Sequence, residues 1–268
     1  MSIPPNRIKN RLSALQASNK KALVPFITAG DPSKESTVEI MHALVRGGAD
    51  IIELGVPFSD PMADGPTIQR SSERALERGV NTNFVFDSVK RFREQDDDTP
   101  VVLMGYLNPI EMRGLDTYAG QAVQAGVDGV LLVDLPPEEA APMREAFNQH
   151  GLYLISLAAP TTTPERLHRL ATESQGYLYY VSFAGVTGAS GIDTEDVLSK
   201  ASALTKQAKV PVMIGFGIKD AASAKALAPA ADGIVIGSAL VEALAASPRP
   251  SDTAEAFLKP IRDALDSI

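Results

Sequence analysis

The sequence predicts an α/β fold, a single (β/α)8 TIM barrel that spans residues 1–268 and carries an extra N-terminal helix. Eight short runs of β-branched and aliphatic residues recur along the chain, with helical segments between them. Most of these runs are almost continuously apolar, which is typical of parallel strands covered on both faces. Eight such units match a closed barrel, whereas an open nucleotide-binding sheet would typically carry a G-x-G-x-x-G or Walker loop, and neither occurs here.

The strands are predicted in chain order at 22–30, 49–55, 100–106, 127–134, 152–158, 176–182, 210–217 and 231–238. Helical spacing is found at 36–48, 115–126, 138–151, 163–171 and 220–230. N-caps are predicted at Asp31-Pro32-Ser33, Thr163 and Asp220. An amphipathic segment at about 7–17 precedes the first strand, and we expect it to cover the bottom of the barrel. Residues 246–252 are predicted to form a turn between two C-terminal helices.

A weak internal repeat supports this array of units. The segments GGADIIELG, AGVDGVLLVD and AADGIVIGS each place small residues and then an aspartate before a buried strand. The aspartates are Asp50, Asp128 and Asp232. Repetition of one supersecondary unit is expected of a (β/α) barrel.

The composition restricts the possible functions. The chain has 25 Lys+Arg against 33 Asp+Glu, a net charge of −8, and no long basic cluster, which argues against nucleic acid or an anionic membrane as a partner. It contains no cysteine, which excludes disulfides, thiolate metal sites and a cysteine nucleophile. The three histidines lie in predicted helices, so no metal site is expected. No membrane-length apolar run or signal-peptide core is evident, and a cytoplasmic location is expected.

Glu53 is the most informative residue. It lies inside the apolar run Ile51-Ile52-Glu53-Leu54, and strand alternation places it on the face opposite Ile52 and Leu54. A buried carboxylate must be paired or have a raised pKa. A raised pKa suits a general acid or base working near pH 7. A structural ion pair is the alternative interpretation.

The loop at 56–66 adds two carboxylates and three prolines. Asp60-Pro61 is typical of a turn. Asp64 precedes Gly65-Pro66, so it either caps the next helix or extends over the mouth of the barrel. The spacing by itself favours neither interpretation.

Glycines gather at the ends of the last three predicted strands. They lie in Gly185-Val186-Thr187-Gly188, Gly215-Phe216-Gly217 and Gly237-Ser238. Glycine lets backbone N–H groups approach an anion, and the loops after strands 7 and 8 form the usual phosphate site of such barrels. The sequence therefore predicts a phosphate ester as substrate. Phe26, Tyr106, Tyr179 and Phe216 lie at or near strand ends, where they either pack in the core or stack on a flat substrate.

The block ELGVPFSDPMADGPTIQ at 53–69 closely resembles the signature of the tryptophan synthase alpha chain family. Further blocks follow in the same order over nearly the whole chain: PFITAGDP, LMGYLNPI, LLVDLPPEE, YYVSFAGVTGA, GFGI and GSALV. The resemblance implies a lyase that cleaves indole-3-glycerol phosphate to indole and glyceraldehyde 3-phosphate. Other phosphate-binding barrels share the glycines but lack the first block.

The resemblance also implies roles for residues. Glu53 would protonate indole C3 and help remove the hydroxyl proton, and Asp64 would bind the indole N–H. Tyr179 and Thr187 would support the carboxylates and a closing loop. Phe26, Tyr106, Leu131, Tyr179, Thr187 and Phe216 match substrate-binding positions, and Gly188, Gly217, Gly237 and Ser238 match the phosphate site. No cofactor is implied in this chain, because protonated indole is itself the electron sink.

The family's partner is a PLP-dependent beta chain, so an alpha2-beta2 heterotetramer is expected. Pro57, Asp60, Asn108 and Pro136 match positions at or near the contact. Many members carry an arginine where this chain has Phe183, which cannot make the hydrogen bonds of that arginine. The sequence therefore does not determine the free energy of closing the loop after strand 6. Two other interpretations remain: a non-catalytic barrel that regulates a partner, and another phosphate-binding barrel enzyme. The carboxylates argue against the first, and the lack of a strand-end lysine argues against an indole-glycerol-phosphate synthase.

Overall fold

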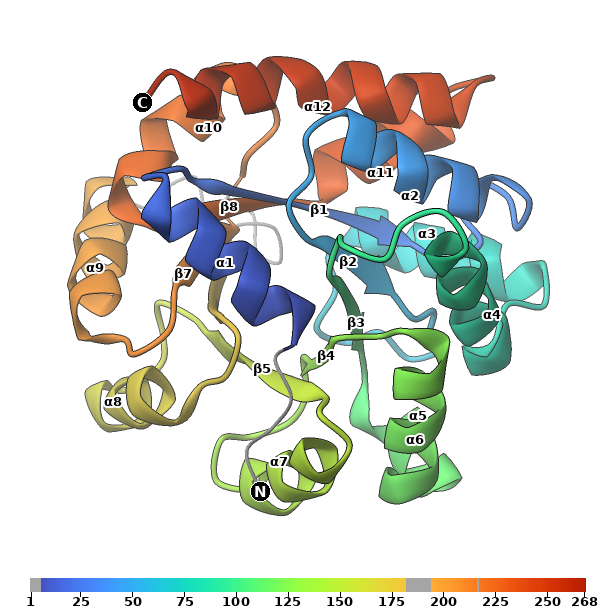
Figure 1. Ribbon diagram of the computed structural model, residues 1–268, viewed down its shortest axis with the longest axis horizontal. Coiled ribbons are helices and arrows are strands. Elements are labelled where there is room, and N and C mark those ends of the chain that lie inside the picture. The colour runs from blue at the N-terminus through green and yellow to red at the C-terminus, as the bar shows by residue number, and fades with distance from the viewer. Residues whose placement is uncertain (1–5, 182–193, 216) are drawn as a thin grey trace.

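Eight parallel strands close into a barrel in sequence order, with β8 paired to β1 (Figure 1). The computed structural model describes residues 6–181, 194–215 and 217–268. The predicted (β/α)8 barrel is therefore confirmed. Helices surround the strands, and the long C-terminal helix runs across one side of the barrel (Figure 1).

Each predicted strand contains an observed one. The strands are β1 Ala22–Thr28, β2 Ile52–Gly55, β3 Val101–Gly105, β4 Gly129–Leu132, β5 Tyr153–Ala158, β6 Leu178–Val181, β7 Val212–Gly215 and β8 Gly233–Ile236. The helices are α1 Arg7–Ala17, α2 Ser36–Arg46, α3 Pro66–Glu77, α4 Thr82–Arg93, α5 Leu107–Arg113, α6 Leu115–Ala125, α7 Ala140–Gln149, α8 Pro164–Glu173, α9 Thr194–Gln207, α10 Ala221–Leu227, α11 Ser238–Ala245 and α12 Pro250–Asp266. A 3-10 turn, η1, covers Ala228–Ala230. Within the described ranges, no helix is long and apolar enough to cross a bilayer.

Alternation along the strands divides the apolar residues between two cores. On β2, Ile52 and Leu54 face the surrounding helices, whereas Glu53 and Ile51, which lies just before the strand, face the barrel interior. The interior is filled by one or two inward residues from each of several strands, together with residues of α1. This packing confirms the predicted orientation of Glu53 with respect to its neighbours.

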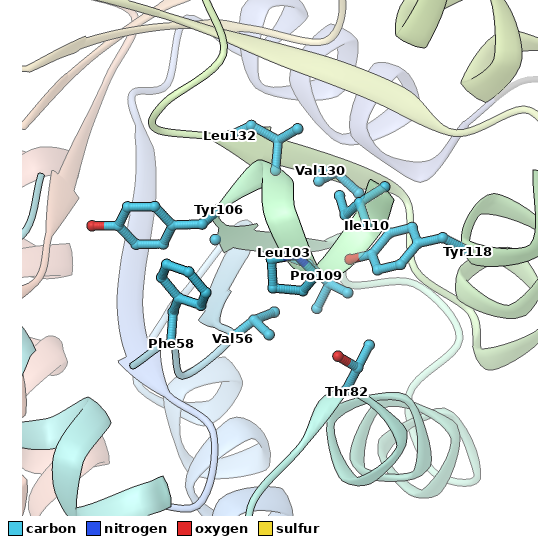
Figure 2. Close-up of a pocket in the computed structure, with 11 residues that line it drawn as sticks. Val56, Phe58, Thr82, Leu103, Tyr106, Pro109, Ile110, Tyr118, Val130 and Leu132 are labelled. Carbon is cyan, nitrogen blue, oxygen red and sulfur yellow. The ribbon is translucent and has the colours of Figure 1, made fainter. Parts of the chain in front are cut away.

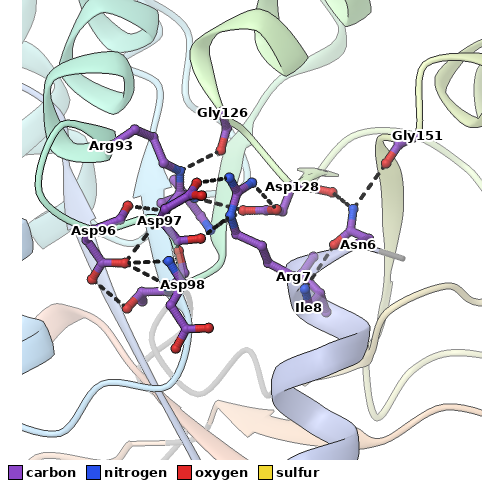
Figure 3. Close-up of polar contacts among 12 residues, drawn as sticks. Asn6, Arg7, Ile8, Arg93, Asp96, Asp97, Asp98, Gly126, Asp128 and Gly151 are labelled. Atoms are coloured by element: carbon purple, nitrogen blue, oxygen red, sulfur yellow. Dashed lines mark hydrogen bonds and ion pairs between the residues drawn. The ribbon is translucent and has the colours of Figure 1, made fainter. Parts of the chain in front are cut away.

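Helix α1 closes the end of the barrel where the strands begin (Figure 1). Its Ile8 and Leu12 pack into the interior core, as the amphipathic pattern predicted. Asn6 caps the helix by accepting a hydrogen bond from the Ile8 N–H at 2.9 Å. The Asn6 side chain also donates to the carbonyls of Asp128 and Gly151 at 2.7 and 3.1 Å, which ties α1 to the starts of β4 and β5 (Figure 3).

The three repeated aspartates make the same pair of contacts. Each lies just before its strand and donates its backbone N–H to the carbonyl of a residue at the start of an adjacent strand. Its carboxylate accepts the backbone N–H of that same residue. The pairs are Asp50 with Leu23, Asp128 with Val101 and Asp232 with Val212, with carboxylate distances of 2.9, 2.9 and 2.8 Å. The sequence repeat thus has a structural cause, because each aspartate joins neighbouring strands where the ladder begins.

The capping predictions had mixed outcomes. Thr163 and Asp220 are N-caps, and Asp220 forms a full capping box with Ser223. The prediction at Asp31-Pro32-Ser33 was wrong in part. Asp31 instead pairs with Arg74 at 2.7 Å, while the Ser33 hydroxyl accepts the Ser36 N–H at 3.2 Å. The predicted C-terminal turn is shorter than expected, because α12 begins at position 250.

Candidate active site

Glu53 is the second residue of β2, lies in the barrel interior and is fully buried. Its neighbours in the sheet register are Phe26 on β1 and Val102 on β3. The Tyr177 hydroxyl donates to Glu53 Oε1 at 2.6 Å, while the buried Oε2 has no hydrogen-bond partner among the described residues. No ion pair from a described residue reaches this carboxylate, so the structural ion-pair interpretation lacks a partner among them.

Burial raises the pKa of Glu53 from 4.5 to about 7, and the Tyr177 hydrogen bond only partly opposes this rise. The carboxyl group is therefore near half-ionisation at neutral pH. An acid–base catalyst that both gives and takes a proton works best in this range.

Asp64 lies in the loop between β2 and α3, and the Tyr106 hydroxyl donates to its Oδ2 at 3.1 Å. The same hydroxyl accepts the Ala63 N–H at 3.0 Å. Helix α3 begins at Pro66 with Gly65 as its N-cap and without a side-chain cap, so Asp64 is not the helix cap. Of the two interpretations left open by the sequence, this geometry removes the capping one.

Burial raises the pKa of Asp64 to about 6, again partly offset by a tyrosine hydrogen bond, here from Tyr106. Asp64 thus remains mostly ionised at neutral pH, whereas Glu53 does not. Two carboxylates with separated pKa values suit two different roles in one reaction.

Tyr106 holds Asp64 from the start of α5 and is itself fixed by stacking. Its ring lies 4.8 Å from the Phe58 ring, centroid to centroid, with a 26° angle between the planes. An apolar cavity of about 10 Å³, the size of one water, lies on the helix side of β3 and β4 and is lined by Leu103, Tyr118 and Val130. Figure 2 shows the Tyr106 hydroxyl pointing away from this cavity. The Tyr106 and Phe58 side chains thus border the cavity, while the hydroxyl that binds Asp64 points away from it.

Two glycines make room for aromatic side chains at the mouth. A Cβ at Gly215 would lie 2.1 Å from the Tyr179 hydroxyl, and one at Gly55 would lie 2.6 Å from the Phe26 ring. Neither position tolerates a larger residue without moving an aromatic ring. Burial and, secondarily, the charge of Glu53 raise the pKa of Tyr179, so its hydroxyl stays protonated.

The described glycines of the predicted phosphate site have free space beside them. Gly217 has φ +53°, and no described atom lies within 4 Å of the position that a Cβ would take there. A Cβ at Gly237 would make only ordinary contact with Phe26 at 3.6 Å. Gly237 is the N-cap of α11, and Ser238 is its exposed first residue. Unpaired N–H groups at a helix start favour an anion. Thr187, Gly188 and Phe216, like Phe183, lie outside the described residues.

The remaining predicted residues lie close to this end of the barrel. Phe26 and Leu131 are buried, and Leu131 belongs to the interior core with Val102 and Tyr179. Tyr177 was not singled out from the sequence, although the alternation that turns Tyr179 inward also turns Tyr177 inward. Among the described residues, no group of three or more His, Asp or Glu side chains is arranged to hold a metal ion.

Comparison with known proteins identifies the family of the chain. The family profile "Tryptophan synthase alpha chain" matches residues 12–264. A tryptophan synthase alpha chain from Xanthomonas euvesicatoria pv. vesicatoria is 62% identical over 264 residues, covering 97% of this chain and 98% of the relative. One from Xanthomonas campestris pv. campestris (strain B100) is 61% identical over 271 residues, covering 100% of both chains.

Solved structures agree as well. The crystal structure of tryptophan synthase subunit alpha from Legionella pneumophila str. Paris superposes with a TM-score of 0.92 at 46% identity, covering 98% of this chain and 100% of the other. The chain belongs to the tryptophan synthase alpha chain family, whose reaction is the cleavage of indole-3-glycerol phosphate in tryptophan biosynthesis.

Proposed function

We propose that Glu53 is the proton-transfer residue for the cleavage of indole-3-glycerol phosphate in this chain. The observation that carries the proposal is the state of its carboxyl group: fully buried, held at one oxygen by Tyr177, without a described partner at the other, and with a pKa of about 7. Oε2 is therefore the atom left to exchange a proton with substrate.

The reaction balances with one carboxyl group. Glu53 in its acid form gives a proton to indole C3, which makes the ring an iminium-type electron sink. The side-chain hydroxyl then loses its proton, the C–C bond breaks, and its electrons return to the ring. Indole and an aldehyde form, and the hydroxyl proton restores the acid form of Glu53. The ring itself accepts the electrons, so we propose that this chain uses no cofactor.

Asp64 has the second role in this proposal. Ionised and held by Tyr106, it accepts a hydrogen bond from the indole N–H and stabilises the positive charge that develops when C3 is protonated. Its pKa of about 6 supports this role, because a carboxylate that stays charged at neutral pH is a better electrostatic partner than Glu53.

The other predicted residues complete the proposed site. Phe26, Tyr106, Leu131 and Tyr179, with Thr187 and Phe216, would enclose the indole and the glycerol chain. Gly217, Gly237 and Ser238, with Gly188, would bind the phosphate through backbone N–H groups and the start of α11. We propose that residues 1–268 act as one catalytic domain.

Membership of this family implies a beta-chain partner. We propose an alpha2-beta2 heterotetramer in which the beta chain carries PLP, and a cytoplasmic location. Asp60 and Asn108 are exposed, Pro136 is half-buried and Pro57 is buried, so the first two are the more accessible members of the proposed contact. Pro57 would then act by shaping the loop.

The test of the proposed chemistry is Glu53→Gln, assayed for cleavage of indole-3-glycerol phosphate with the cognate beta chain present. Removing proton transfer should lower the rate by about 10²–10⁴-fold while substrate binding persists. Glu94→Gln, an exposed glutamate at the end of α4, is the matched control and should leave the rate unchanged. Turnover near that of the wild type in folded Glu53→Gln would refute the assignment.

A further inference from the structure

A second cavity opens at the opposite end of the barrel, where the strands begin. It has a volume of about 330 Å³ and lies between α1 and the residues that lead into β5, β6 and β7. Its floor is made by Leu12, Tyr153, Gly176, Val210 and Pro211. Figure 1 shows α1 lying across this end of the barrel. The cavity is large enough for a small organic ligand and is separated from Glu53 by the interior core.

Tyr153 is the first sign that a ligand belongs in this cavity. Its side chain is only 9% exposed, and its ring packs in the interior core against Gly176. No described residue makes a hydrogen bond to its hydroxyl, and the side chain lines the cavity. The hydroxyl oxygen is not among the fully buried unpartnered atoms, so it is accessible from the cavity. A ligand atom in the cavity would accept a hydrogen bond from it.

The charges at the rim are the second sign. Lys9 on α1 and Lys209 before β7 line the cavity, and neither forms an ion pair with a described residue. Two nearby lysines are engaged: Lys20 lies 3.7 Å from Asp266, and Lys21 donates to the Ala231 carbonyl at 2.7 Å. Within the described part of the chain no acidic side chain lines the cavity, although the net charge is −8. The two lysines thus form a local positive pair that suits an anion.

The floor of the cavity determines which ligand body fits beside the charged group. Leu12, Val210 and Pro211 present apolar surface to the cavity. Gly176 contributes only backbone, and a Cβ at this position would lie 2.9 Å from the Ile155 side chain. A floor made of backbone and an aromatic ring favours a flat apolar ligand over a bulky one. We propose that this cavity binds a small aromatic carboxylate, its ring against the floor and its carboxylate between Lys9, Lys209 and the Tyr153 hydroxyl.

The test uses 2-naphthoate as the probe and isothermal titration calorimetry of the full chain, with the barrel mouth filled by a saturating indole-phosphate analogue. Tyr153→Phe should weaken binding about tenfold, because it removes a hydrogen bond to a charged group. Lys9→Gln and Lys209→Gln should each weaken it about three- to fivefold. The neutral amide of the probe should bind more weakly than the carboxylate.

Lys206→Gln is the matched control, because Lys206 lies on α9 close to Lys209 but does not line the cavity. It should change affinity by less than about twofold. Circular dichroism and chemical unfolding establish that each variant is folded. The proposal is overturned by an absence of saturable binding to the folded wild-type chain, by affinity that survives all three cavity variants, or by equal binding of the amide.

Discussion

Glu53 and Asp64 show how one barrel gives two carboxyl groups different chemistry. Glu53 is surrounded by interior core residues and receives a single hydrogen bond from the described residues, donated by Tyr177. Asp64 lies on a half-buried loop and receives one from Tyr106. The deeper group has the higher pKa, about 7 against about 6, because desolvation is the main cause of both shifts and grows with burial.

Burial of Glu53 also predicts how stability depends on pH. Its folded-state pKa of about 7 lies above the ordinary 4.5, so the ionised form is disfavoured in the folded chain. Stability should therefore fall as the pH rises from about 4.5 through 7, by up to about 3 kcal/mol. Glu53→Gln has no charge to bury. Thermal unfolding should therefore show that the variant gains stability relative to the wild type as the pH rises over that range. Stability that depends on pH in the same way in both proteins would contradict this expectation.

Tyr177→Phe tests the hydrogen bond to Glu53. Since this bond lowers the pKa of Glu53, its loss should raise that pKa further above its present value of about 7. The limb of the kcat/KM profile governed by Glu53 should move to higher pH, by up to about one unit. A purely structural role for Tyr177 would lower activity equally at every pH. Tyr118→Phe, at a buried tyrosine on α6, is the control and should leave the profile in place.

At the scale of elements, side-chain hydrogen bonds and ion pairs connect the starts of the strands, in addition to the backbone hydrogen bonds of the sheet. Asp128 accepts the Val101 N–H, and it also pairs with Arg93 at 2.9 Å and Arg7 at 3.1 Å (Figure 3). One buried carboxylate therefore connects β3, β4, α4 and α1. Asp97 pairs with the same Arg7 but is almost fully exposed.

Because Asp128 is buried and Asp97 is exposed, removing each should lower the free energy of unfolding by a different amount. Asp128→Ala removes a partner from the largely buried Arg93 and should destabilise the chain by about 3–5 kcal/mol. Asp97→Ala breaks a solvent-screened pair and should cost less than about 1 kcal/mol. Urea denaturation of the two variants measures the contrast. Comparable losses would show that burial does not set the strength of this network.

At the scale of the molecule, the two ends of the barrel differ. One end is closed by α1 and the aspartate network. The other carries Glu53, Asp64 and the open glycines. Two large apolar side chains, Met62 and Met112, are about four-fifths exposed, on the loop after β2 and on α5 after β3. A contiguous exposed apolar patch is typical of a surface that a partner covers, and we predict that both methionines lie in the beta-chain contact.

We predict that the isolated chain is folded but a poor catalyst, and that its cognate beta chain activates it. A tenfold rise in a thinly populated closed state requires about 1.4 kcal/mol of preference for that state. Titration of the beta chain, followed by cleavage of indole-3-glycerol phosphate, measures the effect. An isolated chain that already reaches the rate of the complex, with no response to a bound partner, would disprove this prediction.

Met62→Glu and Met112→Glu test whether these two residues lie in the contact with the beta chain. Each should raise the beta-chain concentration that gives half-maximal activation by about tenfold, a loss of about 1.4 kcal/mol. Val123→Glu changes an exposed apolar residue near the C-terminal end of α6 and should have no such effect. Equal effects of all three substitutions would argue against a contact at Met62 and Met112.

Local patterns in the sequence predicted the architecture and singled out Glu53 as a buried carboxylate. Eight apolar runs with helical segments between them predict the barrel, because strands buried on both faces must be apolar throughout. Alternation placed Glu53 opposite its apolar neighbours, since side chains on a strand point to alternate faces. The family signature supplied the reaction. The roles of all the predicted site residues stay predictions, and Thr187, Gly188 and Phe216 lie outside the described residues.

Only the tertiary structure decided which groups meet. Tyr177 contacts Glu53 across 124 residues of sequence, and Tyr106 contacts Asp64 across 42. Asp128 reaches Val101 across 27 residues because β3 and β4 are adjacent in the closed barrel. The pKa of Glu53 is likewise set by desolvation from strands far apart in the chain. Such contacts depend on barrel closure and strand register, which fix distances that no local pattern contains.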